Sequence, residues 1–423
     1  MFDRVKNIVP YHQHQALGAS IGNFLEFYNF IIYAFFAPMI GEVFFSAHNP
    51  MVSLICALLT FSAGYIARPL GSIYFGFYVE KHGSAATLSL TFILMGISSL
   101  FLVLTPGVNT IGYVAPILVV VARVVQGFSE GGDVGPSTDL LFSQIGKRYR
   151  SAYIIMQPAT QYIASFCGVF VGLILSLILS KESLYSWGWR IPFAMGILIV
   201  PVGFWIRSSI PQEIPLKKVK KSQKRKVGSF FAINMFVYVA SGSVLTYIRT
   251  FGVSYAVNVL GLPTTVAMAA MSIGLLLGIM GMLISMKIHA KIPAKKILLS
   301  LNLIQVLSLY PAYYYATHLS GIISQIVLNT VLFLPAGLMA TTVWSLILES
   351  LPKENRSLVY GITYTLAVCL FGGVTQPIVA WLIAHTGSVM IPAYVGTGAS
   401  IIGSLSLLHL NFKYSNAKNS VML

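Results

Sequence analysis

The amino-acid sequence predicts an all-α membrane protein that crosses the bilayer twelve times. Of its 423 residues, 56% are hydrophobic and 9% are charged, whereas about 25% of the residues in a soluble domain are charged. The apolar residues gather in runs of about 20, the length that an α-helix needs to span the hydrocarbon core. The three cysteines lie inside such runs, so we expect packed thiols and not disulfides.

Twelve apolar runs follow one another along the chain, and each is expected to form one transmembrane helix. Several exceed the minimum length, which permits a tilted or kinked helix. No cleavable signal peptide is expected ahead of the first run, because no small-residue cleavage site is present there. The expected spans are residues 17–38, 52–78, 86–106, 111–141, 152–179, 189–208, 229–257, 264–287, 296–316, 321–348, 358–384 and 390–410.

The distribution of Lys and Arg predicts the orientation of these spans. If the N-terminus is cytoplasmic, 22 of the 27 basic residues fall in cytoplasmic segments, two in outer loops and three within spans. This asymmetry places both termini in the cytoplasm. The net charge of +16 is then explained by the Lys and Arg residues that set the topology beside anionic lipid, and no nucleic-acid partner is expected.

The longest cytoplasmic segment, which contains the basic run from Lys217 to Lys226, divides the spans six and six. The expected domains are an N-terminal six-helix bundle at residues 1–210, a basic cytoplasmic linker at 211–228 and a C-terminal six-helix bundle at 229–423. We interpret the basic run as a solvated tether that also fixes topology.

Charged residues inside the spans are costly in hydrocarbon and need a partner or a wet cavity. In the fourth span, Arg123, Gln126, Glu130 and Asp133 recur at intervals that place them on one face of a helix. Glu26 lies about midway along the first span, at a depth similar to that of Arg123. A pair between Arg123 and either Glu26 or Asp133 is therefore expected, either as a switch or as a static contact between spans.

Several motifs occur in an order that resembles a known family. They are Gly22-Asn-Phe-Leu-Glu26-Phe-Tyr-Asn29-Phe30, Gly64-Tyr-Ile-Ala-Arg68-Pro69, the R-x-x-Q-G-F-S-x-G-G-E element that runs from Arg123 to Asp133 with Asp133 in place of the Glu, Trp187-Gly-Trp-Arg190, Glu349-Ser-Leu-Pro352-Lys-Glu-Asn-Arg356 and Phe371-Gly-Gly-Val-Thr-Gln376-Pro377. Together they resemble the major facilitator superfamily and, within it, the metabolite:proton symporters that include osmolyte, citrate, 2-oxoglutarate and shikimate carriers.

The resemblance implies two six-helix bundles around a site near the membrane midplane, which is exposed to each side in turn. The implied function is import of a small polar metabolite (an organic acid, osmolyte or amino acid) by proton symport. The alternative is a carrier of the same fold with another cargo or direction: uptake of a carboxylate siderophore, metabolite export, or uniport. The implied protein is a monomer in the cell inner membrane and not an enzyme; its partners are the substrate, protons and the lipid bilayer, without cofactor or metal.

The resemblance also implies roles for particular residues. Asn29 stands where the family has an acid, which keeps uniport open, and Glu80 is retained while the basic pair that normally follows it is lost. Arg249 would suit an anionic substrate; the alternative is that it extends to the membrane interface. The expected proton-coupling residues are Asp133, Glu26 and Arg123; the substrate-binding residues are Asn29, Gln126, Glu130, Arg249, Tyr364 and Gln376; and the gating residues are Arg68, Glu80, Glu349 and Arg356.

Overall fold

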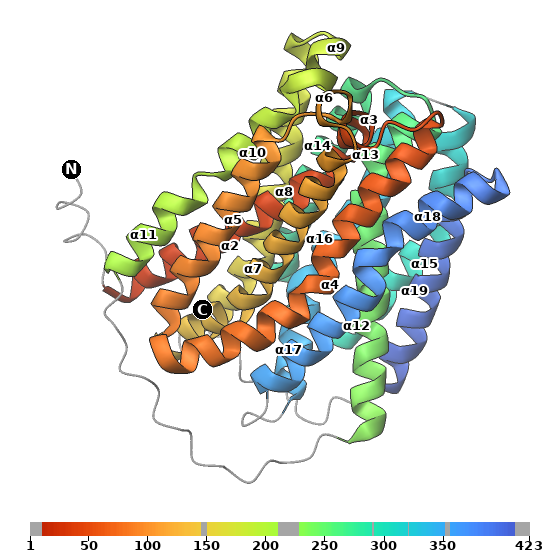
Figure 1. The fold of residues 1–423 in the computed structure, drawn as a ribbon. Helices are drawn as coiled ribbons and strands as arrows, with labels where there is room; N and C mark the ends of the chain where they lie inside the picture. Colours follow the sequence, from red (N-terminus) through yellow and green to blue (C-terminus); the bar gives the residue numbers. More distant parts are fainter. Residues whose placement is uncertain are drawn as a thin grey trace.

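The computed structural model describes residues 11–144, 150–209, 228–289, 292–319, 321–351 and 356–410. Within these ranges the side chains of residues 11–19, 133–144, 150–156, 206–209, 348–350 and 356–358, and of a few single residues, are outside the description. The described chain is an assembly of helices that run roughly along one common direction (Figure 1).

The first half of the chain supplies the helices up to α11, which we call the N-terminal half. Their bounds are α2 Tyr11–Phe35, α3 Ala37–Phe44, α4 Pro50–His82, α5 Ser84–Leu104, α6 Val108–Ile111, α7 Val114–Gln144, α8 Arg150–Ile178, α9 Lys181–Ser183, η1 Leu184–Gly188, α10 Arg190–Gly196 and α11 Ile199–Ser209, where η marks a π-helical turn.

The second half supplies the helices from α12 onward, which we call the C-terminal half. Their bounds are α12 Ser229–Thr250, α13 Gly252–Ser254, η2 Tyr255–Val259, α14 Thr264–His289, α15 Ala294–His318, α16 Ile322–Ser350, α17 Arg356–Ala367, η3 Val368–Gly372, α18 Gly373–Thr386 and α19 Ile391–His409. Of the segment predicted to link two bundles, residues 211–227 lie outside the described residues.

The predicted spans agree with the helices to within a few residues in most cases. Eleven described helices are long and apolar enough to cross a membrane, and the bent pair Ser20–Phe35 and Ala37–Phe44 makes a twelfth. This pair is bent by 66° at Phe36, which the sequence interpretation did not foresee. The cause is Pro38, whose nitrogen has no hydrogen to donate to the carbonyl four residues earlier.

π-Helical turns occur at three other predicted spans: η1 precedes the expected start of the sixth, η2 overlaps the end of the seventh, and η3 lies within the eleventh. The sixth was expected to begin at residue 189, but its helical path begins at Lys181 and passes through η1. The eleventh divides at η3, where Gly372 and Gly373 follow one another. A Cβ atom on Gly372 would lie 2.4 Å from the Tyr247 ring, and one on Gly373 would lie 2.6 Å from Tyr65 Cβ. The two glycines thus allow α4 and α12 to pack against this turn.

One glycine seam joins two helices within each half. Between α4 and α7, a Cβ atom on Gly71 would lie 1.8 Å from the Phe128 carbonyl oxygen, and one on Gly127 would lie 1.8 Å from that of Gly64. Between α14 and α16, a Cβ atom on Gly337 would lie 2.0 Å from the Gly278 carbonyl oxygen. These backbone contacts are the close approach that small residues permit in membrane helices.

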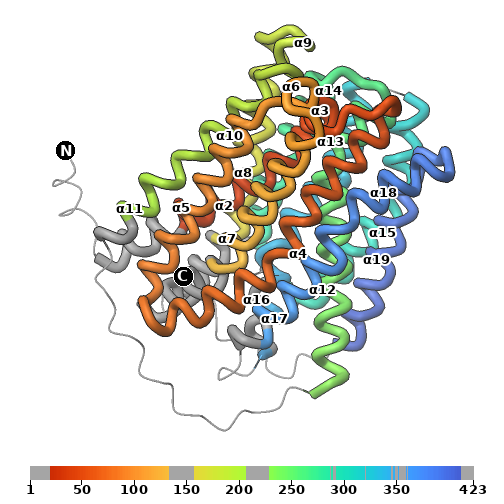
Figure 2. Tube along the Cα trace, in the orientation of Figure 1, coloured from red at the N-terminus to blue at the C-terminus, as the bar shows by residue number. Residues whose placement is uncertain are grey.

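The assembly has two distinguishable ends (Figure 2). At the end that we call the linker end, α11 stops and α12 starts; at the opposite end, the loop end, lies α9. The halves contact one another mainly through α8 with α14 and α4 with α18. Ser62 Oγ donates a hydrogen bond to the Gly373 carbonyl oxygen, 2.6 Å away, and Tyr247 donates one to the Tyr65 hydroxyl.

Arg190 caps the C-terminus of α5, which lies at the loop end of the assembly. Its guanidinium donates hydrogen bonds to the carbonyl oxygens of Val103 at 3.0 Å, Thr105 at 3.1 Å and Ser186 at 2.6 Å. The same group lies 4.5 Å from the centre of the Trp189 ring. A cation is favourable at this position, because unpaired carbonyl groups give the C-terminus of a helix partial negative charge.

Candidate functional site

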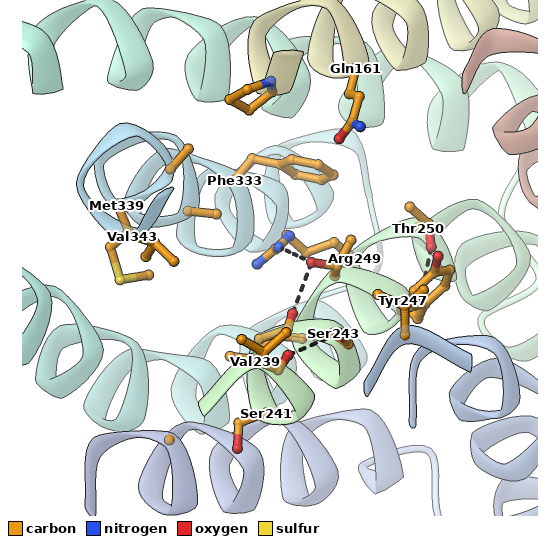
Figure 3. A pocket seen from close by; sticks show the side chains of 18 of the residues that line it. Gln161, Val239, Ser241, Ser243, Tyr247, Arg249, Thr250, Phe333, Met339 and Val343 are labelled. Atoms are coloured by element: carbon orange, nitrogen blue, oxygen red, sulfur yellow. Dashed lines mark hydrogen bonds between the residues drawn. The ribbon is translucent and has the colours of Figure 1, made fainter. Parts of the chain in front are cut away.

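A cavity of about 250 Å³ lies between the two halves. The N-terminal half contributes residues of α2 and α8, including Phe27, Gln161 and Tyr162, and the C-terminal half contributes residues of α12, α14, α15, α16, α17, α19 and η3. Figure 3 shows Gln161 on α8 and Phe333 on α16 extending toward Arg249 on α12. The wall is mostly apolar, with a few polar groups that could orient a ligand.

Arg249 is the charged group among the described residues that line this cavity. Its side chain is 9% exposed, and Nη2 donates a hydrogen bond to Thr246 Oγ1 at 2.7 Å (Figure 3). The described residues give the guanidinium no other hydrogen bond, and none of the residues that line the cavity is an Asp or Glu. This position in the cavity wall is not the position at the membrane interface that was the alternative expected for Arg249. The wall therefore carries a positive charge that a ligand could neutralise.

Two other predicted substrate residues lie on this side of the molecule. Tyr364, on α17, lines the cavity. Gln376, on α18, does not line it: Nε2 donates hydrogen bonds to the Tyr247 carbonyl oxygen at 3.2 Å and to Thr250 Oγ1 at 2.7 Å. Gln376 thus holds the end of the helix that carries Arg249.

A chain of hydrogen bonds crosses the interior of the N-terminal half. Arg123 Nη1 donates to Gln126 Oε1 at 2.5 Å, Gln126 Nε2 donates to Ser99 Oγ at 3.0 Å, and Ser99 Oγ donates to Asn29 Oδ1 at 2.8 Å. Asn29 Nδ2 then donates to the carbonyl oxygens of Gly196, at 2.8 Å, and Leu25, at 3.0 Å. Each side chain donates to the next one, beginning with the arginine. Through these bonds the four side chains connect α7, α5, α2 and α10.

Arg123 is fully buried beside aromatic rings and not beside a carboxylate. Its guanidinium carbon lies 4.3 Å from the centre of the Phe30 ring, 4.5 Å from that of Tyr33 and 5.1 Å from that of Phe61. Cation–π contacts with three rings can stabilise a desolvated guanidinium. Among the described side chains, no ion pair joins Arg123 to Glu26, although Glu26 is itself buried. The side chain of Asp133, the other expected partner, lies outside the described residues.

The ion pair that the described structure does contain joins Arg68 of α4 to Glu130 of α7. Arg68 Nε donates to Glu130 Oε2 at 2.8 Å, and the guanidinium lies 4.4 Å from the centre of the Tyr65 ring. Arg68 was expected to act in gating and Glu130 in substrate binding. Like Asn29 and Gln126, Glu130 lies outside the cavity wall and has a partner within the N-terminal half.

The remaining gating candidates lie near the linker end. Glu80 is exposed, two residues before the end of α4. Glu349 and Arg356 belong to α16 and α17, and their side chains are outside the described residues.

The sequence interpretation missed several polar residues of the cavity wall. Gln161 on α8 and Asn302 and Gln305 on α15 all line it. They are uncharged, so a search for charges inside spans passes over them. The available signal was an Asn and a Gln three residues apart, and therefore on one face, within an apolar span.

The chain is similar in sequence and in fold to known transport proteins. A citrate-proton symporter of Salmonella typhi is 26% identical over 419 residues, which are 95% of this chain and 96% of that one. A putative proline/betaine transporter of Staphylococcus haemolyticus is 29% identical over 429 residues, 95% of this chain and 88% of that one. The partially occluded inward-open conformation of the xylose transporter XylE from E. coli has a TM-score of 0.75 at 14% identity, covering 94% of this chain and 97% of that one.

At that identity the xylose transporter shows the fold alone, which is the major facilitator fold that the sequence resemblance implied. The family model of the Major Facilitator Superfamily matches residues 19–370. That match spans all the helices from α4 to α17 and most of α2. The chain belongs to the Major Facilitator Superfamily, and it is a transporter and not an enzyme.

Proposed function

We propose that this transporter imports a small organic anion together with protons. The observation that carries the proposal is the charge of the cavity wall, where Arg249 is buried with one hydrogen bond to described residues and no Asp or Glu is among the described residues that line the space. A guanidinium in this state can bind a carboxylate through two parallel hydrogen bonds. A cavity of about 250 Å³ suits a metabolite of a few carbon atoms.

Energetics favour protons as the co-transported ion. Moving one negative charge into a cell costs about 2.3 kcal/mol for each 100 mV of inside-negative potential. Co-transport of at least one proton per negative charge removes that cost. The Salmonella typhi relative, aligned over 95% of this chain, is named for citrate-proton symport. We assign the proton to Glu26 and Asp133 of the N-terminal half, which leaves the cation of the cavity available to the substrate.

Contacts between the halves support an inward-facing state. The bond from Ser62 to Gly373 joins α4 to the eleventh span, and the bond from Tyr247 to Tyr65 joins α12 to α4. The cavity wall extends from Thr250 toward the linker end, where it includes Tyr238. The positive-inside rule makes the linker end cytoplasmic. We therefore propose that this multi-pass protein of the inner membrane works as a monomer and that its substrate site faces the cytoplasm in this state.

Uptake into proteoliposomes tests this function. Labelled carboxylates, betaine and amino acids are offered with the outside acidic, with and without an uncoupler. We expect a carboxylate to accumulate and the uncoupler to abolish its accumulation. Accumulation that is indifferent to the uncoupler would mean uniport, and uptake of betaine alone would contradict the proposal.

Variants of Arg249 test the site itself. Charged hydrogen bonds contribute about 1.5–3 kcal/mol, so Arg249→Gln should lower kcat/KM for the carboxylate by about 10- to 100-fold. Arg249→Lys should retain part of the activity, because it keeps the charge but not the paired geometry. Lys181→Gln, which removes an exposed cation at the loop end, is the control and should leave uptake unchanged. Equal uptake by Arg249→Gln and the control would refute the assignment.

A further inference from the structure

On the part of the cavity wall formed by α15 and α19, buried polar side chains have no hydrogen-bond partner among the described residues. We call the part of the wall formed by Asn302, Gln305 and Ser400 the amide branch. These side chains are 5%, 0% and 1% exposed. Asn302 Nδ2, both Gln305 Nε2 and Gln305 Oε1, and Ser400 Oγ have no hydrogen-bond partner among the described residues. Two donors, one acceptor and one hydroxyl group of the cavity wall are therefore left unsatisfied by the described residues.

Such a cluster is costly unless something fills it. An unpaired buried polar group destabilises a protein by about 1–3 kcal/mol. The great majority of buried polar atoms in proteins have a partner, which can be a bound molecule or ordered water. Because the amide branch is continuous with the cavity wall that carries Arg249, a molecule in the cavity can reach it.

Packing between helices places the amide branch in the same layer as Arg249. A Cβ atom on Gly403 would lie 3.2 Å from Ser241 Cβ, and one on Gly396 would lie 3.5 Å from Leu309 Cδ1 and Ile248 Cδ1. Ser400 lies between those two glycines, and is therefore level with the part of α12 between residues 241 and 248. Gln305 lies about one helical turn, ~5 Å, from Leu309 in the direction of the linker end.

The guanidinium of Arg249 lies at this level as well, because it bonds to Thr246 Oγ1. The arginine and the amide branch thus line one cavity at overlapping levels.

The chemistry of the amide branch limits what it can bind. None of the three side chains is charged, and a charge buried there without a counter-charge would be strongly unfavourable. A quaternary ammonium group could not satisfy the amides, because it neither donates nor accepts a normal hydrogen bond. A hydroxyl, carboxamide or protonated carboxyl group both donates and accepts, as the amide branch requires.

We propose that the amide branch is a specificity subsite, which binds an uncharged hydrogen-bonding group of an anion whose carboxylate is held by Arg249. The inference rests on the proposed function and narrows it to hydroxy acids and partly protonated polycarboxylates. Gln305 contributes a donor and an acceptor, Asn302 a donor, and Ser400 either. In the absence of substrate, ordered water would occupy these positions.

Pairs of acids that differ by one hydroxyl group test the subsite. Uptake is measured for citrate against tricarballylate and for malate against succinate, in proteoliposomes that contain the wild-type protein. A site that binds a hydroxyl group rejects the analogue without it, because its own polar groups are then left unpaired. We expect kcat/KM for the hydroxylated acid of at least one pair to be higher by about 100-fold or more.

Gln305→Met removes the amide at nearly constant shape and should reduce this ratio below about 10-fold, mainly by improving uptake of the acid that lacks the hydroxyl group. Gln325→Met is the matched control: Gln325 is also a buried glutamine with an unpartnered Nε2, but it does not line the cavity. This control should keep the wild-type ratio. Ser400→Ala, a smaller change, is the second variant if Gln305→Met does not fold, and it should lower the ratio in the same direction.

Two outcomes distinguish a failure of the subsite from a failure of the proposed function on which it rests. If carboxylate uptake depends on Arg249 but both members of each pair are transported equally, water alone satisfies the amides; the subsite is then wrong and the proposed function stands. If no carboxylate is transported while betaine is, both are wrong. A hydroxyl preference that persists unchanged in both Gln305→Met and Ser400→Ala would also overturn the subsite.

Discussion

Ser99 is the middle of the hydrogen-bond chain in the N-terminal half, and its removal should destabilise the protein more than its size suggests. Its hydroxyl group accepts from Gln126 Nε2 and donates to Asn29 Oδ1. Ser99→Ala therefore leaves an amide donor and an amide acceptor unpaired in the interior, where all three side chains are fully buried.

The size of the effect follows from these two orphaned groups. Each costs about 1–3 kcal/mol when left without a partner, so we expect a loss of about 2–6 kcal/mol of unfolding free energy. For a chain of about 400 residues the unfolding entropy is near 0.8 kcal/mol per kelvin. The expected fall in Tm is therefore roughly 2–7 °C.

The neighbouring serine provides the control. Ser98 is also buried, but its hydroxyl group donates only to the Met95 carbonyl oxygen of its own helix, 2.8 Å away. Ser98→Ala leaves that oxygen its helical hydrogen bond and should cost less than about 1 kcal/mol. Thermal unfolding of both purified variants in one detergent compares them directly. Equal Tm values for Ser98→Ala and Ser99→Ala would refute the chain of hydrogen bonds as a stabilising element.

Three further experiments test other parts of the structure. Gly71→Ala should prevent correct packing of α4 on α7 and abolish a monodisperse gel-filtration peak, whereas Gly76→Ala, on the same helix with open space around it, should behave like the wild type. Arg190→Gln should lower the unfolding free energy by about 1.5–3 kcal/mol, since it removes charged hydrogen bonds to three carbonyl oxygens; an unchanged Tm would contradict this. In a cysteine-free background, an impermeant maleimide should label Ser183→Cys in intact cells and Ser222→Cys only after permeabilisation, and the reverse pattern would invert the orientation.

Composition and hydropathy were sufficient to predict the helices, because each span must satisfy its own backbone hydrogen bonds in the bilayer. They could not predict the interruptions. The bend at Phe36 depends on one proline within an otherwise apolar run, and the π-turn η3 depends on how closely Tyr65 and Tyr247 approach Gly372 and Gly373.

The site was harder to predict, since its partners are distant in the sequence. The spacing of Arg123 and Glu130 on one face was correctly interpreted as a polar stripe, but a stripe does not say which helix it meets. In the structure Glu130 pairs with Arg68, and Arg123 meets three aromatic rings and Gln126. Sequence depth alone had suggested a pair between Arg123 and Glu26, and no such ion pair is present among the described side chains.

The glycine seams determine where a transporter of this design can move. At Gly71, Gly127 and Gly337 the contact is made by backbone atoms, and a backbone contact has no rotamers through which to exchange one packing for another. Each half should therefore move as a rigid body when substrate binds. The rearrangement is left to the surfaces between α4 and α18 and between α8 and α14, where side chains such as Tyr65 and Tyr162 can exchange partners. Mutations in a glycine seam would then lower the yield of folded protein, and mutations at the contacts between the two halves would change the transport rate.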